Sequence, residues 1–357
     1  MSFSNFWENK KVFLTGHTGF KGSWTAMWLS YLGAKVKGYS LEPPTHPSLF
    51  EEASIENLIQ SDINDIRNFE KLKSSIKEFS PDIVIHMAAQ PLVRASYKNP
   101  LETYETNVIG TANILQASIS SESIGAIINI TTDKCYENKE IDIAYTESDP
   151  MGGVDPYSSS KGCAELVTSA YRESFFKKEK IGIASVRAGN VIGGGDWAED
   201  RLIPDILRAF ESNKPVIIRN PNATRPWQHV LEPISGYLLL AEKLYNSPLK
   251  FSEGWNFGPE LEDVKAVDKI LDYMIKIWPG NSWQLDLSDN PHEANLLKLD
   301  ISKVKSKLKW KPTWNLETSL EKILYWHKEW ISKPNNTQNL CINNIKQHIK
   351  ESENGKN

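Results

Sequence analysis

Five side chains in the first half of the chain have types and spacing that suit acid–base chemistry. Thr132, Asp133 and Lys134 are consecutive, whereas Tyr157 and Lys161 are four residues apart and would share one face of a helix. A free tyrosine has a pKa near ~10, and a neighbouring ammonium favours its phenolate. Such a phenol can take a proton from an alcohol, and a nearby carboxyl can act as an acid.

These features also have ordinary structural explanations. The Tyr-x-x-x-Lys spacing occurs by chance on exposed helices, and a carboxyl after a strand, such as Asp133, can be a turn residue or a helix cap. Cys135, in the same segment, is interpreted as a packing residue rather than a nucleophile. The chemical interpretation therefore depends on what precedes these residues in the chain.

A glycine-rich turn precedes them and directly follows an apolar run at 12–15. It comprises Gly16, Thr18, Gly19, Phe20, Lys21 and Gly22. Its spacing differs from G-x-G-x-x-G, but the physical argument is shared: glycines let the backbone approach a diphosphate at the start of a helix, and Lys21 adds a positive charge. A plain strand-to-helix turn is the alternative. The place of the glycine-rich turn directly after an apolar strand favours a site for a dinucleotide cofactor.

The ends of the next two strands bear on which cofactor binds. An acidic residue at the end of the second strand would hold the ribose hydroxyls of NAD. Here that strand ends at Ser40, and Glu42 comes slightly late, so this strand alone leaves NAD and NADP open. Asp62 and Ile63, which precede the helix expected at 66–79, are expected at the adenine end.

Apolar runs and amphipathic stretches alternate with short connections through the first half of the chain. Strands are expected at 12–15, 35–39, 82–88, 126–131 and 181–186, and helices at 22–32, 66–79, 107–118 and 155–176. This alternation predicts an α/β fold with a doubly wound parallel (Rossmann) sheet. Asp155 and Pro156 are typical of a helix start, which places Tyr157 and Lys161 in its first turns.

The expected domain organisation has three parts. Residues 1–187 form the NAD-binding Rossmann domain, to which a later segment at about 226–256 returns. Residues 188–333 form mostly a smaller α/β C-terminal substrate-binding lobe. Residues 334–357 are read as a polar tail, although Leu340, Ile342, Ile345 and Ile349 would suit one short docking helix.

Composition excludes several classes of protein. The chain has 357 residues and a net charge of −4, which gives no general cationic field for nucleic acid. Its three cysteines lack metal-ligand spacing, so no metal site is expected. No apolar run approaches the ~20 residues of a membrane span, which predicts a cytoplasmic protein with no membrane association.

Several segments resemble the extended short-chain dehydrogenase/reductases, and within them the nucleotide-sugar 4,6-dehydratases. The resemblance covers roughly residues 8–332, and its most specific segments are 16–24, 132–138, 149–157, 187–201 and 225–230. The members most similar to this chain act on CDP-glucose. The resemblance implies NAD as cofactor, CDP-glucose as substrate, and a homodimer or higher oligomer formed through helices at 103–118 and 155–176. It also implies a role in deoxysugar biosynthesis for O-antigen lipopolysaccharide.

The resemblance further implies a reaction with no net redox change. Tyr157, assisted by Lys161 and Thr132, takes the proton of the sugar 4-hydroxyl while hydride leaves C4 for NAD. The 4-ketone acidifies C5–H, a base removes that proton, and protonated Asp133 gives a proton to the departing 6-hydroxyl. Hydride then returns to C6. The product is a 4-keto-6-deoxy sugar nucleotide.

Lys134 is where the chain departs from part of the family. The dTDP-glucose members have Glu at this position as the C5 base, so Lys134 is either the base or a positioning residue. UDP-N-acetylglucosamine 4,6-dehydratases also use an Asp-Lys pair and remain the alternative. A 4-epimerase would not need Asp133. A catalytically silent dinucleotide sensor would typically lack Tyr157 or Lys161.

The remaining expected contacts come from the family segments. Arginine offers the planar fork that suits a substrate diphosphate. The expected substrate contacts are Asn190, Arg201, Arg219, Arg225 and His292, and an ordinary surface residue is the alternative for each. The further cofactor-side residues are Ala88, Gln90 and Asn107, of which Asn107 resembles the residue that orders an active-site water chain.

Overall fold

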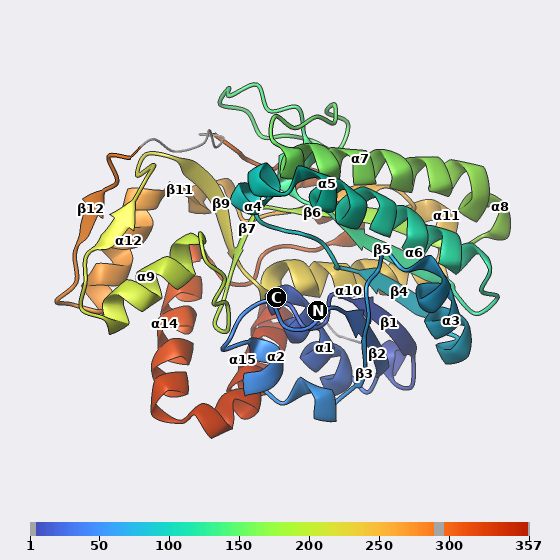
Figure 1. Ribbon diagram of the computed structural model, residues 1–357, viewed down its shortest axis with the longest axis horizontal. Coiled ribbons are helices and arrows are strands. Elements are labelled where there is room, and N and C mark those ends of the chain that lie inside the picture. Colours follow the sequence, from blue (N-terminus) through green and yellow to red (C-terminus); the bar gives the residue numbers. More distant parts are fainter. Residues whose placement is uncertain (1–4, 289–295, 356–357) are drawn as a thin grey trace.

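The computed structural model describes residues 5–288 and 296–355 and centres on a seven-stranded parallel sheet (Figure 1). Its strand order is β10-β6-β5-β4-β1-β2-β3, and every neighbouring pair is parallel. The strands are β1 Lys11–Thr15, β2 Lys35–Ser40, β3 Gln60–Ile63, β4 Ile83–His86, β5 Ala126–Ile130, β6 Gly182–Ala188 and β10 Gly254–Phe257. The predicted doubly wound sheet is confirmed.

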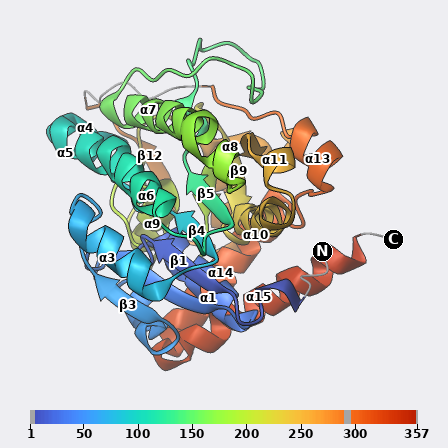
Figure 2. The same cartoon turned by 90° about the vertical axis from the view of Figure 1, so that its right-hand side faces the viewer.

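Helices cover both faces of this sheet, so both faces are buried. Successive side chains of one strand point to opposite faces and therefore belong to different cores. In β1, Val12 and Leu14 belong to the core with Trp24 and Trp28, whereas Phe13 belongs to the core on the other face. Figure 2 shows the helices on the two sides. The first layer contains α1 Phe20–Tyr31 and α10 Leu231–Asn246, and the second contains α3 Phe69–Phe79, α6 Gly110–Ile119 and α7 Pro156–Tyr171.

A smaller α/β lobe with its own hydrophobic core follows the sixth strand. It has a three-stranded sheet of β7 Asn190–Ile192, β9 Thr224–His229 and β11 Val264–Ala266, and a pair of β8 Val216–Ile218 with β12 Trp283–Leu285. Its helices are α9 Leu202–Glu211, α12 Val267–Ile277 and α14 Leu316–Ser332. The chain returns to the large sheet through α10 and β10. The domain boundaries themselves stay a prediction.

The C-terminal segment differs from the expected polar tail. It forms an 18-residue helix, α15 Thr337–Asn354, that packs on α1 and buries Leu340, Cys341 and Ile345. Here the alternative of a docking helix is correct, and the helix is longer than expected. Its polar residues also take part, because His348 is fully buried and its Nε2 lies 2.9 Å from the Glu232 carboxylate of α10.

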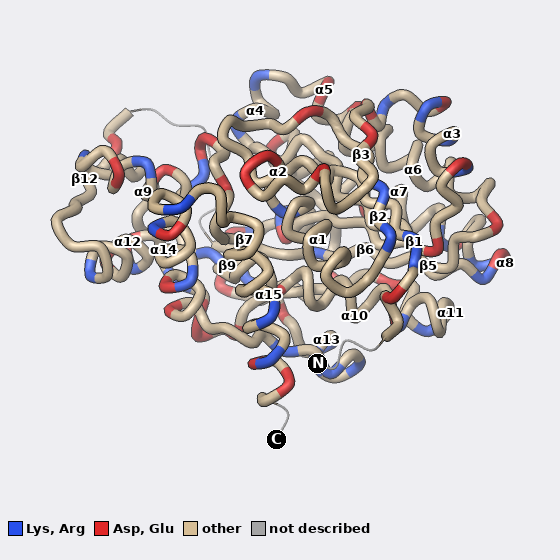
Figure 3. Tube along the Cα trace, turned by 90° about the horizontal axis from the view of Figure 1, so that it is seen from below, with Lys and Arg blue, Asp and Glu red and all other residues tan. Residues whose placement is uncertain are grey.

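Several short elements complete the region around the large sheet. They are α4 Val93–Lys98, α5 Pro100–Tyr104, a π-helical turn Glu105–Ile109, a 3-10 turn Asp133–Cys135, and a π-helical turn Arg172–Phe176 that extends α7. Acidic and basic residues are interspersed along the chain trace, without one dominant basic face in this view (Figure 3). Within the described ranges, no helix has the length and apolar composition that a membrane span requires.

Candidate active site

A cavity of about 1140 Å³ lies between the carboxyl ends of the large sheet's strands and the smaller lobe. The sheet side contributes the glycine turn after β1, Ser40 at the end of β2, Ala88 after β4, and the segment 130–134 at the end of β5. The lobe side contributes Asn190, Arg201, Arg219 and Arg225. The cavity therefore joins the predicted cofactor, catalytic and substrate segments in one site.

The glycine turn has the shape that a dinucleotide diphosphate requires. Gly16 has φ +77°, and a Cβ there would lie 2.7 Å from the Ala88 nitrogen. A Cβ at Gly22 would lie 2.0 Å from the Gly16 carbonyl oxygen, whereas one at Gly19 would meet only that oxygen, at 3.5 Å. Gly19 precedes α1 without a side-chain cap. The first N–H groups of α1 can therefore receive an anion beside the turn.

Lys21 belongs to the glycine turn, and it also interacts electrostatically with residues of the predicted catalytic and substrate sites. Burial lowers the pKa of Lys21 to about 7, and the positive charges of Arg201 and Lys161 act in the same direction. Asp133 raises the pKa of Lys21. This side chain links the turn electrostatically to the predicted catalytic residues.

The structure places some of the predicted adenine-side residues elsewhere. Ser40 lines the cavity and its hydroxyl lies 2.9 Å from that of Thr18. Asp62 does not line it, because its carboxylate accepts hydrogen bonds from Asn64 and from Ser75 of α3. Ile63 is also outside the lining. The residues found there instead are Leu41, Glu42, Asn64 and Asp65. Of these, the sequence analysis named only Glu42, as the acid that follows the second strand.

Asn107 and Gln90 lie behind the cavity wall. The Asn107 side chain accepts a hydrogen bond from the Gln90 backbone N–H at 2.8 Å and donates to the Gln90 carbonyl at 3.1 Å. It also donates to the Ser160 hydroxyl at 2.9 Å. Since Ser160 is on α7, Asn107 fixes the loop after β4 against the helix that carries Tyr157.

All five predicted catalytic side chains line the cavity. Thr132, Asp133 and Lys134 follow β5. Tyr157 and Lys161 come from the first turns of α7, whose start is capped by Asp155, as the sequence predicted. Lys161 Nζ donates to the carbonyl of Ile130 at 3.2 Å and so ties α7 to the end of β5.

Burial controls the proton affinities of the phenol and the amine. It raises the pKa of Tyr157 to about 12, while a hydrogen bond with Thr132 lowers that pKa and the Asp133 charge raises it. Burial also lowers the pKa of Lys161 to about 8, against the raising effect of Glu165. The Tyr157 phenol is thus protonated near neutral pH in the absence of a further positive charge.

Asp133 has surroundings that favour the protonated form of its carboxyl group. It is 2% exposed; its Oδ1 accepts a hydrogen bond from Thr132 at 3.0 Å, and its Oδ2 has no partner within the described residues. Burial raises the pKa of Asp133, whereas Lys134 and Thr132 lower it. A protonated Asp133 can donate to a group that enters the cavity.

The lobe side of the cavity is rich in arginine. Arg201 pairs with Asp196 at 2.9 Å, Arg219 contacts Asp200 at 3.4 Å, and buried Arg225 donates to the Thr224 carbonyl at 3.0 Å. Arg94 of α4, which sequence reasoning missed, also lines the cavity. His292 lies outside the described residues.

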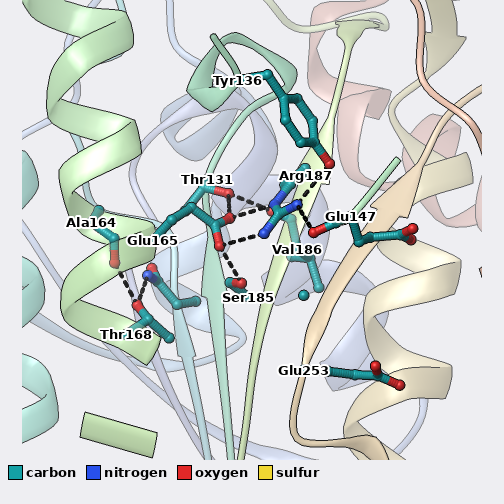
Figure 4. A network of polar contacts seen from close by, with 12 residues as sticks. Thr131, Tyr136, Glu147, Ala164, Glu165, Thr168, Ser185, Val186, Arg187 and Glu253 are labelled. Carbon is teal, nitrogen blue, oxygen red and sulfur yellow. Dashed lines mark hydrogen bonds and ion pairs between the residues drawn. The ribbon is translucent and has the colours of Figure 1, made fainter. Parts of the chain in front are cut away.

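A buried ion pair supports the catalytic segment from behind (Figure 4). Arg187 of β6 donates to both carboxylate oxygens of Glu165 at 2.8 Å. The same carboxylate accepts hydrogen bonds from the hydroxyls of Thr131 and Ser185, each at 2.6 Å. Glu165 lies on α7 one turn after Lys161, so the pair joins the ends of β5 and β6 to the catalytic helix. Sequence reasoning did not single out either partner.

Comparison with known proteins decides the family. A family model described as GDP-mannose 4,6 dehydratase matches residues 13–323. The CDP-glucose 4,6-dehydratase of Salmonella typhimurium is 60% identical over 333 residues, which cover 92% of this chain and 93% of that protein. This chain belongs to the nucleotide-sugar 4,6-dehydratase family. The resemblance inferred from the motifs is confirmed.

Solved structures show the same fold at lower identity. UDP-glucuronic acid 4-epimerase from Bacillus cereus, in complex with UDP-glucuronic acid and NAD, is similar with a TM-score of 0.78 and 25% identity over 89% of this chain and 99% of that chain. dTDP-glucose 4,6-dehydratase from Bacillus anthracis, in complex with NAD, has a TM-score of 0.73 and 22% identity. The match covers 90% of this chain and 97% of that chain. Both solved structures therefore share the fold of this chain.

Proposed function

We propose that this 4,6-dehydratase converts CDP-glucose to CDP-4-keto-6-deoxyglucose with NAD as cofactor, in deoxysugar biosynthesis for O-antigen lipopolysaccharide. The 60% identity to a CDP-glucose 4,6-dehydratase supports the substrate. The observation that carries the reaction type is Asp133. Its carboxyl group is buried near Tyr157, and one of its oxygens has no partner among the residues that the structure describes. This carboxyl supplies the acid that elimination of water requires, whereas a simple 4-epimerase needs no such acid.

The glycine turn and the start of α1 fit the cofactor diphosphate, as the Gly16 and Gly22 contacts indicate. When bound, NAD supplies an acceptor for the C4 hydride and later a donor of hydride to C6. The remaining chemistry belongs to the protein: it must orient the sugar, remove two protons, deliver one to the leaving group and reprotonate C5.

Tyr157 is the proposed base for the 4-hydroxyl. Thr132 hydrogen-bonds the phenol and lowers its pKa, in the direction that oxidation of the alcohol requires. Lys161, held on the Ile130 carbonyl, follows Tyr157 by one turn of α7 and lines the same cavity, where it is the proposed source of an ammonium for the phenol. A positive charge there favours the phenolate, which compensates for the opposing effect of burial.

Asp133 and Lys134 are proposed to carry out the elimination. Once C4 is a ketone, the C5 proton is acidic, and its removal allows the 6-hydroxyl to leave with the proton of Asp133 as water. Lys134 lines the cavity directly after Asp133 and is the proposed C5 base. It can accept that proton only as a neutral amine.

A direct assay tests the proposal. Purified protein with NAD is incubated separately with CDP-glucose, UDP-glucose, dTDP-glucose and UDP-N-acetylglucosamine, and a 4-keto-6-deoxy product is sought by mass and by its ketone absorbance. CDP-glucose should be dehydrated with the highest kcat/KM. Preferred dehydration of UDP-N-acetylglucosamine would instead support the alternative substrate class, and epimerisation without loss of water would overturn the reaction type.

We also propose a homodimer or higher oligomer in the cytoplasm. Apolar side chains on α5, α7 and the adjoining π-helical turns are exposed: Leu101 is 78% exposed and Leu166 61%. A second copy could cover this surface. Three free cysteines suit a reducing compartment. Light scattering at micromolar concentration should show a dimer or larger species, whereas a monomer would contradict the assembly.

A further inference from the structure

Three charged residues bridge the two lobes at the rim of the cavity. Arg94 of α4 donates from Nη1 to Asp200 Oδ1 at 3.0 Å, and Arg219, after β8, donates from Nη1 to the same oxygen at 3.4 Å. All three residues line the cavity, and their side chains are 31%, 40% and 23% exposed for Arg94, Asp200 and Arg219. One carboxylate oxygen thus lies between two guanidinium groups that come from opposite sides.

This arrangement has the chemistry of an oxyanion site. Two guanidinium groups that converge on one oxygen provide the contacts that a phosphate oxygen receives in arginine-based recognition. The Asp200 carboxylate carries the same charge sign and fills that place in the structure. Asp200 has φ +60°, a left-handed conformation that Asp and Asn tolerate better than most residues.

The next residue, Arg201, contacts a different part of the site from Asp200. Arg201 pairs with Asp196, which is buried, and the electrostatic influence of Arg201 reaches Tyr157 and Lys21. The loop at 196–201 therefore directs one side chain toward the reaction centre and the next toward the rim. Movement of Asp200 away from the rim need not disturb the Arg201 contact with Asp196.

We propose that Asp200 is a displaceable stand-in for the substrate diphosphate: it bridges Arg94 and Arg219 across the cavity and yields both arginines to the nucleotide sugar. The inference rests on the proposed function, because it takes a nucleoside diphosphate sugar as the ligand. It adds Arg94 as a substrate-binding residue of the large domain and Asp200 as a determinant of affinity.

The energetic scale suits displacement. Ion pairs between partly exposed side chains change an equilibrium constant by only about fivefold or less each, so their loss is a small cost compared with the gain of two charge-assisted contacts to a diphosphate. A fully buried pair, such as Glu165 with Arg187, could not be exchanged in this way, because separation would leave a desolvated charge. The exposed fractions therefore distinguish the rim contacts from the structural ion pair.

Calorimetric titration of the intact protein with CDP, with cytidine and with NAD tests the proposal. Asp200→Asn keeps the size and the left-handed backbone but removes the competing charge. It should tighten CDP binding about fivefold, because CDP no longer has to displace the one or two partly exposed ion pairs of Asp200. Arg94→Met should weaken CDP binding about tenfold or more, as expected for loss of a hydrogen bond to a charged group.

The other ligands separate the possible sources of the diphosphate. Cytidine has no phosphate, so its affinity should not change in either variant. NAD affinity should also be unchanged, and tighter NAD binding in Asp200→Asn without tighter CDP binding would overturn the assignment to the substrate. Glu173→Gln is the matched control, because it breaks an exposed pair with Lys177 (2.8 Å) on the extension of α7.

Unchanged or weaker CDP binding by Asp200→Asn would overturn the proposal, since Asp200 would then be an ordinary surface partner or a structural residue. Failure of the proposed substrate is a separate result. If the wild-type protein binds UDP but not CDP, the nucleotide assignment is wrong, and the same variants titrated with UDP still decide the role of Asp200.

Discussion

Glu165 and Arg187 form a doubly hydrogen-bonded ion pair, and each side chain is only 5% exposed (Figure 4). Burial alone would raise the pKa of Glu165, but the Arg187 guanidinium and the hydroxyls of Ser185 and Thr131 hold that pKa below its usual range. The carboxylate is therefore charged at neutral pH. Burial lowers the pKa of Lys161 to about 8, and the Glu165 carboxylate opposes this effect by raising that pKa.

Glu165→Gln should shift the alkaline limb of the pH profile to lower pH. Without the carboxylate the pKa of Lys161 falls further, so the ammonium that supports the Tyr157 phenolate is lost at a lower pH. The measurement is kcat/KM for substrate from pH 6 to 9. Glu165→Asp keeps the charge and should retain more of the wild-type profile. An unshifted alkaline limb would show that Glu165 does not act through Lys161.

Tyr157→Phe should reduce turnover by about 10²–10⁴-fold, the usual cost of losing a positioned acid–base group. Burial raises the pKa of Tyr157 to about 12, so the phenolate fraction, and with it the rate of C4 oxidation, should rise with pH in the wild type as long as Lys161 stays charged. NAD binding, measured by titration, should persist in the variant. Turnover close to wild type would remove Tyr157 from its proposed role.

Asp133→Asn should separate oxidation from elimination. The amide preserves size but cannot donate the acid proton, so oxidation at C4 continues while loss of water stalls. Absorbance of bound NADH should rise after substrate is added and remain high. If no NADH forms at all, Asp133 instead serves the oxidation step or the binding of the sugar.

Lys134→Met should block removal of the C5 proton and leave C4 oxidation intact. In deuterated water, the variant should form NADH but incorporate no deuterium at C5. Lys134→Glu, which places a carboxylate where the dTDP-glucose members have one, is the companion variant and should recover part of the exchange. Exchange at the wild-type rate in Lys134→Met would mean that another group is the base.

Glu232→Ala should destabilise the protein by about 3 kcal/mol, because it leaves buried donors without an acceptor. The Glu232 carboxylate accepts the backbone N–H groups of Thr313 and Trp314 at 2.8 and 2.9 Å and lies 2.9 Å from His348 Nε2. Urea denaturation gives the free energy of unfolding, and hydrogen exchange should show earlier opening of α15. Glu353→Gln, on the exposed side of α15, should change stability by less than about 0.5 kcal/mol.

Local patterns in the sequence were enough to predict the main parts of the site. Helical spacing places Tyr157 and Lys161 together, and the C-terminal ends of parallel strands place the glycine turn and Asp133 at the same crevice. These features depend on a few neighbouring residues and on a rule of topology. The cavity lining agrees with both.

Features that depend on long-range partners were not predicted. Asp62 has the right type for a cofactor contact, but its carboxylate faces Ser75 of α3. Arg94 meets Asp200 across 106 residues of sequence, and periodicity does not identify such partners. Helix α15 looked like a polar tail because much of its stability comes from burial against other elements, including the contact of His348 with Glu232, rather than from its own composition.

The packing of α15 against α1 has a consequence for how the protein is made. Trp28 of α1 has its ring centroid 5.4 Å from that of His348, so α1 is covered by a helix that is synthesised much later. Domains commonly fold in order from the N-terminus as they leave the ribosome. Here the layer behind the glycine turn stays uncovered on the nascent chain until α15 has been synthesised and can pack on α1.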